Sequence, residues 1–140
     1  MIRKANATWK GGLKSGTGVV STETKVLSGA KYNFVQRFEN EPGTNPEELV
    51  AAAHAACYAM ALSAALEKNN MTPESVDVSS SLTFEKLDVG FTTTRIHLEA
   101  AAKVPGASQE AFLKTAEDAK RTCPISRLLN TTITLEAKLV

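Results

Sequence analysis

The chain has little cysteine, few aromatic residues and almost no net charge. Its 140 residues include two cysteines and one tryptophan. Sixteen basic and fifteen acidic side chains leave a net charge of +1, which excludes the strongly basic surface expected of a protein that binds nucleic acid or an anionic membrane. The first residues, MIRKANATWK, lack the apolar core of a signal peptide. We therefore expect a cytoplasmic protein, where paired cysteines are more often catalytic, redox-active or metal-binding than structural.

The sequence also lacks linker-like, low-complexity and repeated segments. A length of 140 residues is enough for one core, and we expect a single domain over residues 1–140. Residues 50–66 carry no Asp, Glu, Lys or Arg, but this run is at the lower limit of membrane-spanning length. Because His54 and Ser63 interrupt it and charged residues flank it, we interpret it as the buried helix of a soluble protein.

Apolar alternation predicts strands near both ends of the chain and in its middle. The expected strands are residues 2–10, 17–24, 31–38, 76–86, 91–104 and 131–140, with Asp88-Val89-Gly90 as a turn. Helices are expected at residues 108–121 and 124–129. Strands clustered in this way indicate an α+β fold rather than a doubly wound sheet.

The clearest local signal is a helix start after the loop NEPGT. Asn45 is a favourable N-cap, Pro46 suits the first helical position, and Glu47 and Glu48 favour the positive end of the helix. We expect this helix to end at about Lys68. Because it is apolar on almost every side, it needs cover from several directions, and its alanines allow another helix, including one from a second subunit, to approach closely.

The two cysteines, Cys57 and Cys123, have different local settings. Cys57 lies within this apolar helix, where a cysteine is commonly an inert hydrophobic residue. Cys123 opens the segment CPIS, and the following proline favours a helix start whose dipole would stabilise a thiolate. Local pattern alone leaves both cysteines open to a structural or a reactive role.

Two other chemistries are compatible with these residues. His54 is three positions before Cys57 and shares its helical face, so a Cys-His dyad for acyl transfer is one alternative. Zinc bound by His54, Cys57, His97 and Cys123 is another, although only the first two have the close spacing usual in structural zinc sites.

Arg37 and Glu47 are ordinary surface charges by pattern. Their interest is chemical, because a reactive thiol needs a cation to stabilise its thiolate, and a carboxylate can fix an arginine fork in position.

The segment GTNPEELVAAAHAACYAMALS (residues 43–63), together with the later CPIS, resembles the OsmC/Ohr family of thiol peroxidases, and most closely its OsmC branch. The resemblance covers essentially the whole chain. It implies an OsmC-like fold in an intertwined homodimer with active sites at the subunit interface. It also implies that Cys57 is the peroxidatic cysteine, Cys123 the resolving cysteine, and Arg37 and Glu47 the pair that assists the thiolate.

The implied reaction is the reduction of hydroperoxides, organic ones above all, in response to oxidative or osmotic stress. An external dithiol, with the lipoyl type as a candidate, would reduce the resulting disulfide, and no metal or other cofactor is expected. The competing hypothesis from another class is a small-molecule or acyl-carrier binding module with structural cysteines.

Helix geometry adds a constraint on the assisting pair. If Glu47 and Cys57 share one straight helix, the ten residues between them span about 15 Å. A glutamate side chain cannot bridge this distance. Either the Arg37–Glu47 pair that serves a given Cys57 comes from the other subunit, or the chain bends sharply at Pro46. We expect the first, which would make dimerisation a requirement for activity.

Overall fold

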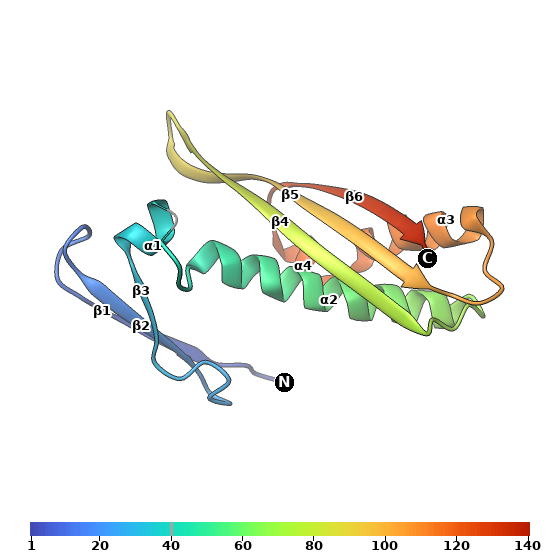
Figure 1. Ribbon diagram of the computed structural model, residues 1–140, viewed down its shortest axis with the longest axis horizontal. Coiled ribbons are helices and arrows are strands. Elements are labelled where there is room, and N and C mark those ends of the chain that lie inside the picture. The colour runs from blue at the N-terminus through green and yellow to red at the C-terminus, as the bar shows by residue number, and fades with distance from the viewer. Residues whose placement is uncertain (40) are drawn as a thin grey trace. The chain divides into compact units, whose positions relative to one another are not determined.

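A computed structural model describes residues 1–39 and 41–140 (Figure 1). The chain forms two compact units, residues 1–49 and 50–140, which are described separately below. The elements belong to an α+β fold, as predicted, with two three-stranded sheets. The single domain expected over residues 1–140 stays a prediction.

The first unit is built on an antiparallel sheet in the order β1-β2-β3. Its strands are Ala5–Lys10, Thr17–Thr22 and Ala30–Asn33. The first two lie where alternation predicts them but are shorter than expected. Gly18 is required where β2 passes the aromatic side chains of its neighbours, because a Cβ there would lie 2.5 Å from the ring of Tyr32.

The strand predicted over residues 31–38 is wrong in its second half. The strand ends at Asn33 and a short helix, α1, follows over Phe34–Phe38. The cause is the Asn33 side chain, whose oxygen accepts a hydrogen bond from the backbone N–H of Gln36 at 2.8 Å and caps the helix. Phe34 and Phe38, one helical turn apart, place their ring centroids 4.7 Å apart. Arg37 consequently lies in the last turn of a helix rather than at the end of a strand.

The long helix α2 covers Pro46–Lys68, as predicted. The Asn45 side chain accepts a hydrogen bond from the backbone N–H of Glu48 at 2.8 Å, which confirms the expected cap. At the other end Asn70 adopts a left-handed conformation with φ 57°, and the N–H of Met71 donates to the carbonyl of Leu66 at 2.9 Å. This bond closes the helix in the manner of a Schellman motif.

The second unit contains a sheet in the order β4-β5-β6. Its strands are Ser75–Leu87, Gly90–Lys103 and Thr132–Leu139, each within two residues of its prediction. β4 and β5 form an antiparallel hairpin, with Gly90 at φ 115° in the predicted turn, whereas β6 runs parallel to β5. Helix α3 (Gln109–Thr122) and the short α4 (Pro124–Leu128) connect β5 to β6.

One face of α2 forms the core of this second unit. Its buried side chains are four residues apart: His54, Tyr58, Leu62 and Leu66. The three apolar residues belong to a cluster with buried residues of β5 and α3, including Ile96, Leu98, Phe112 and Ala116, and His54 is buried as well. By length and composition α2 could also cross a membrane, but the face that carries these four residues packs in the core of the second unit, as expected of a core helix.

The opposite face of α2 is exposed within this chain. It carries small or flexible apolar residues, among them Met60 with 76% of its surface accessible, and the exposed positions are Ala52, Ala53, Ala56, Met60 and Ala64. The chain itself therefore covers one face of α2, whereas the sequence led us to expect cover on several sides. This exposed apolar face is the surface through which the chain can bury further area.

Candidate functional site

The two cysteines lie in contact in the second unit. Cys57 comes from α2 and Cys123 from the start of α4, and their sulfur atoms are 3.3 Å apart. Both are free thiols, because a disulfide bond would bring the sulfurs to about 2.05 Å. Cys123 is completely buried, whereas Cys57 is partly exposed. A reagent from solvent can therefore reach Cys57 first.

Backbone structure fixes Cys123 at a junction of two helices. Its N–H donates to the carbonyl of Ala119 at 2.8 Å and ends α3, while its own carbonyl accepts from Arg127 at 3.0 Å and begins α4. Pro124 occupies the first position of α4, as the segment CPIS predicts. The sulfur of Cys123 therefore faces the amides of the first turn of α4.

These amides affect the two thiols differently. Burial raises the pKa of Cys123, but the backbone N–H of Ser126, the Cys57 thiol, the Ser126 hydroxyl and the N–H of Ile125 together bring it below its ordinary value. The approach of the amides is looser than a standard cap hydrogen bond. Burial raises the pKa of Cys57, the N–H of Ile125 opposes this rise, and Cys123 adds to it. Within this unit the buried thiol is thus the more acidic of the two.

His54, which is on the same helix as Cys57, contacts Ser126 of α4, the helix that begins after Cys123. Its ring is completely buried, and Nε2 lies 2.8 Å from the Ser126 hydroxyl. Burial lowers the pKa of His54, which keeps the imidazole neutral. The hydrogen bond to Ser126 rather than to Cys57 argues against the Cys-His dyad and agrees with a packed, hydrogen-bonded histidine.

The four proposed zinc ligands are not gathered in one place. His97 lies on the outer face of the sheet, where Nδ1 is 2.7 Å from the Thr134 hydroxyl, while His54 and both cysteines contact the core on the inner face. Among the described residues, no cluster contains three or more His, Cys, Asp or Glu side chains in reach of one metal ion.

Arg37 and Glu47 form an ion pair in the first unit. Nη2 of Arg37 lies 2.8 Å from Oε1 of Glu47, and Nε lies 3.3 and 3.2 Å from the two carboxylate oxygens. Glu47 is mostly buried, with 16% of its side chain accessible. Such a fork fixes the guanidinium plane. The expected pairing of these two residues is confirmed.

An aromatic cavity of about 200 Å³ lies beside Arg37. Sequence reasoning did not identify its wall, which comprises Trp9, Leu13, Tyr32, Asn33, Phe34 and Phe38. The spacing of Phe34 and Phe38 gave no signal, because residues four apart share a face both on a helix and on a strand. Ser126 was also not predicted, although it is the last residue of the segment CPIS and occupies the third position of α4.

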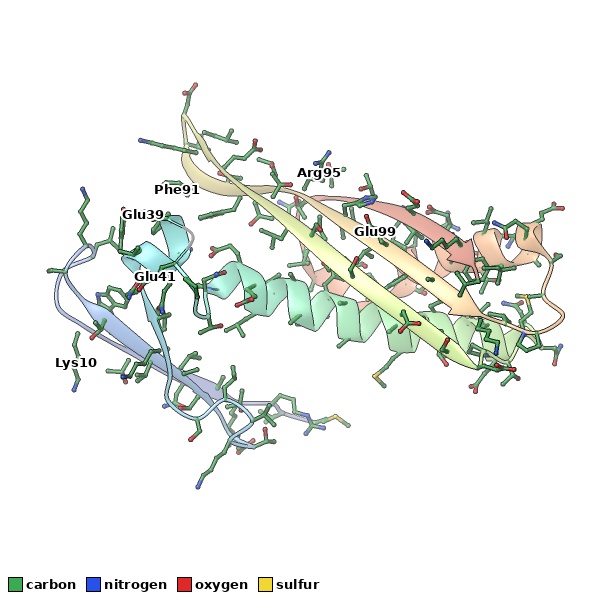
Figure 2. All side chains as sticks on the ribbon, in the orientation of Figure 1. Lys10, Glu39, Glu41, Phe91, Arg95 and Glu99 are labelled. Carbon is green, nitrogen blue, oxygen red and sulfur yellow. The ribbon has the colours of Figure 1, made fainter. Side chains whose placement is uncertain are left out.

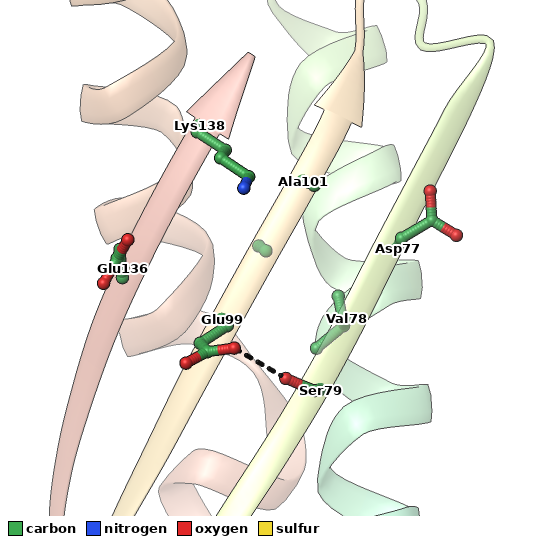
Figure 3. A pocket seen from close by; sticks show the side chains of 8 residues that line it. Asp77, Val78, Ser79, Glu99, Ala101, Glu136 and Lys138 are labelled. Atoms are coloured by element: carbon green, nitrogen blue, oxygen red, sulfur yellow. Dashed lines mark hydrogen bonds between the residues drawn. The ribbon is translucent and has the colours of Figure 1, made fainter. Parts of the chain in front are cut away.

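A larger pocket of about 450 Å³ lies on the outer face of the β4-β5-β6 sheet (Figure 3). Its polar lining includes Asp77, Glu99, Glu136 and Lys138, and the Ser79 hydroxyl donates to Glu99 at 3.2 Å. Figure 2 shows Arg95 and Glu99 on this same face, away from α2. The thiols lie on the other side of the sheet, so this pocket is separate from the reactive site.

Three comparisons with known proteins bear on the chain as a whole. The profile of the OsmC-like protein family matches residues 38–138. Peroxiredoxin OsmC of Escherichia coli (strain K12) is 45% identical over 137 residues, which cover 98% of this chain and 96% of that protein. An organic hydroperoxide resistance protein of Xanthomonas axonopodis pv. citri is 33% identical over 60% of this chain and 58% of that protein.

Solved structures support the same fold. The organic hydroperoxide resistance protein OhrB of Bacillus subtilis superimposes with a TM-score of 0.71 at 24% identity, covering 96% of this chain and 98% of that one. An OsmC-like protein from Mycoplasma pneumoniae reaches a TM-score of 0.78 at 13% identity, covering 100% and 98%. At these identities the likeness concerns the fold alone.

The buried neutral His54 predicts a pH dependence of stability. In the unfolded chain a histidine takes up a proton near pH 6.5, whereas burial lowers the pKa of His54 in the folded state. Below about pH 6.5 the unfolded state therefore binds more protons, and stability falls as the pH falls toward the lowered value. Urea unfolding followed by circular dichroism should show that the free energy of unfolding falls less steeply with decreasing pH in this range for His54→Gln than for wild type. Equal slopes would contradict a buried, neutral His54.

Proposed function

The chain belongs to the OsmC-like family, and from this membership and its thiol pair we propose a peroxidase in which Cys57 attacks hydroperoxides and Cys123 resolves the product. The single observation that carries the proposal is the 3.3 Å contact between the two sulfurs, one partly exposed and one buried. A nucleophilic thiol needs access to its substrate, and a resolving thiol needs access only to the first sulfur.

The reaction proceeds in three balanced steps. The Cys57 thiolate attacks the distal oxygen of a hydroperoxide, the O–O bond breaks, and the alkoxide takes up a proton and leaves as an alcohol. Cys57 is now a sulfenic acid. The Cys123 sulfur then attacks the Cys57 sulfur, the S–O bond breaks, and water leaves as the disulfide forms. An external dithiol restores both thiols by exchange and is itself oxidised to a disulfide.

Among the described residues, no cation is one of the groups that shift the pKa of Cys57. Burial raises the pKa of Cys57, and the neighbouring Cys123 raises it further, so thiolate formation at Cys57 is disfavoured in this setting. A guanidinium close to the sulfur would reverse this preference. Arg37 suits the task because Glu47 holds its fork in a fixed plane while 36% of the Arg37 side chain stays accessible.

We assign this contact to the partner subunit of a homodimer. Glu47 and Cys57 are ten residues apart on the continuous helix α2, a distance of about 15 Å, which Glu47 cannot span to serve the sulfur of its own helix. The exposed apolar stripe of Ala52, Ala56, Met60 and Ala64 on α2 supports an interface of helix against helix, since small residues allow close approach. In such a homodimer each site combines the thiols of one subunit with Arg37 of the other.

The lining of the cavity beside Arg37 favours organic hydroperoxides over hydrogen peroxide. The cavity beside Arg37 is lined chiefly by aromatic side chains, which can bury the organic part of a substrate. The reductant is a dithiol, for which the lipoyl type is the candidate, and the protein acts in the cytoplasm in response to oxidative or osmotic stress.

Cysteine substitutions separate the two roles. Cys57→Ser should reduce steady-state activity with cumene hydroperoxide by roughly 10³-fold or more, because the nucleophile is lost. Cys123→Ser should complete one reduction, leave a sulfenic acid that dimedone traps, and then stall. The measurement is the alcohol released per subunit, together with intact mass. Turnover by Cys57→Ser combined with an inactive first step in Cys123→Ser would reverse the assignment, and thiols unreactive in wild type would favour a binding module.

Mixed dimers test whether Arg37 acts across the interface. Arg37→Lys in both subunits should lower activity roughly 10²-fold, because charge remains but the fork is lost. A dimer that pairs an Arg37→Ala chain with a Cys57→Ser chain should regain one working site, measured after purification through two different affinity tags.

The matched control pairs wild type with a chain carrying both substitutions. If Arg37 acts in trans, each site of this control lacks one essential residue and the dimer is inactive. Activity in the control but not in the first mixed dimer would show that Arg37 serves its own subunit and would contradict the assignment. A fully active monomeric variant would contradict it as well.

A further inference from the structure

One hydrogen bond joins the two elements that carry the thiols. His54 precedes Cys57 by three residues on α2, and Ser126 follows Cys123 by three residues in α4. Nε2 of His54 lies 2.8 Å from Oγ of Ser126. Because each of these residues is one helical turn from a cysteine, the bond fixes α4 against α2 beside the sulfur pair.

Burying the His54 ring at this position costs free energy. His54 is completely buried, and among the residues that the structure describes none forms a hydrogen bond with its Nδ1. A buried polar atom without a partner destabilises the fold, whereas the neighbouring core positions on this face are Tyr58, Leu62 and Leu66. An aliphatic residue at position 54 would avoid the cost. The histidine therefore requires an explanation other than packing.

The chemistry of the pair assigns a direction to the bond. A neutral imidazole has one N–H and one lone pair. If the proton is on Nε2, it is donated to Ser126 Oγ, and the unpartnered Nδ1 holds only a lone pair. The hydroxyl proton of Ser126 is then available for the Cys123 sulfur, whose acidity the Ser126 hydroxyl and backbone N–H both increase. The opposite tautomer would bury an N–H without an acceptor.

We propose that His54 and Ser126 are positioning residues for the resolving step: His54 holds the Ser126 hydroxyl so that it stabilises the Cys123 thiolate and aims it at the Cys57 sulfenic acid. This inference rests on the proposed function. In the step, the Cys123–sulfur to Cys57–sulfur bond forms and the S–O bond of the sulfenic acid breaks. The proton that Cys123 gives up ends on the departing hydroxide, which leaves as water. His54 stays neutral throughout.

The pair contributes to the second step only. Attack on the hydroperoxide occurs at Cys57, whose activation we ascribe to Arg37, so the first step should be insensitive to Ser126. A slower second step leaves the sulfenic acid exposed for longer to a second hydroperoxide, which oxidises it to sulfinic acid. Loss of the pair should thus appear as slower disulfide formation and as greater inactivation at high hydroperoxide concentration.

The experiment resolves the two steps in a single turnover. The reduced protein is mixed with one equivalent of cumene hydroperoxide, dimedone is added at successive times, and intact mass reports the trapped sulfenic acid and the disulfide separately. For Ser126→Ala, sulfenic acid should form at the wild-type rate, while disulfide formation slows about 10- to 100-fold, the effect of losing a hydrogen bond to a charged group. Ser126→Thr keeps the hydroxyl and should restore most of the rate.

A double-mutant comparison tests whether His54 acts through Ser126. His54→Leu should slow the second step less than Ser126→Ala, and the double variant should be no slower than Ser126→Ala alone. The matched control is Thr134→Val, which removes the other histidine–hydroxyl bond, from His97 on the outer sheet face, and should leave both steps unchanged.

Three outcomes would overturn the inference. One is disulfide formation at the wild-type rate in Ser126→Ala. Another is equal slowing of both steps, which would indicate general damage to the fold. The third is additive slowing in the double variant. Failure of the proposed function is distinguishable, because wild type itself would then form neither sulfenic acid nor disulfide.

Discussion

The contact between the Cys57 and Cys123 sulfurs is the interaction on which the function of this protein depends. It exists because the buried face of α2 packs beneath the sheet and α3, and because α3 ends and α4 begins at one residue, Cys123. At 3.3 Å the sulfurs are close enough for a disulfide to form with a small local movement. The fold thus places an oxidisable pair where one member meets the solvent and the other does not.

Different groups control the acidity of the two thiols. The first turn of α4 makes the buried Cys123 the more acidic thiol, which suits a resolving residue that must attack a sulfenic acid. The partly exposed Cys57 has the opposite tendency, and we propose that its activation depends on the guanidinium that Glu47 holds in place. If the activating cation is on a partner subunit, as proposed, the active site would be assembled only on dimerisation, and the exposed face of α2 would then have a functional as well as a structural purpose.

Much of this arrangement could be predicted from the sequence, because it rests on local signals. Asn45, Pro46 and the paired glutamates define the start of α2, and Pro124 defines the start of α4. The predicted strand over residues 31–38 failed because a single helix-capping hydrogen bond, donated by the Gln36 N–H to the Asn33 side chain, outweighed apolar alternation. The His54–Ser126 bond joins residues 72 positions apart, and local pattern carries no information on such a pair. The aromatic cavity likewise draws on β1, β3 and α1.

The most direct test of the thiol pair is a measurement of free thiols and intact mass on the wild-type protein. One equivalent of cumene hydroperoxide is added to the reduced chain, free thiols are counted under denaturing conditions, and intact mass is recorded without reductant. If Cys57 and Cys123 form the redox pair, both thiols should be lost, the mass should fall by that of two hydrogens, and a disulfide should join the two residues within one chain. Two thiols that remain unchanged, or a disulfide that joins different chains, would contradict this pairing.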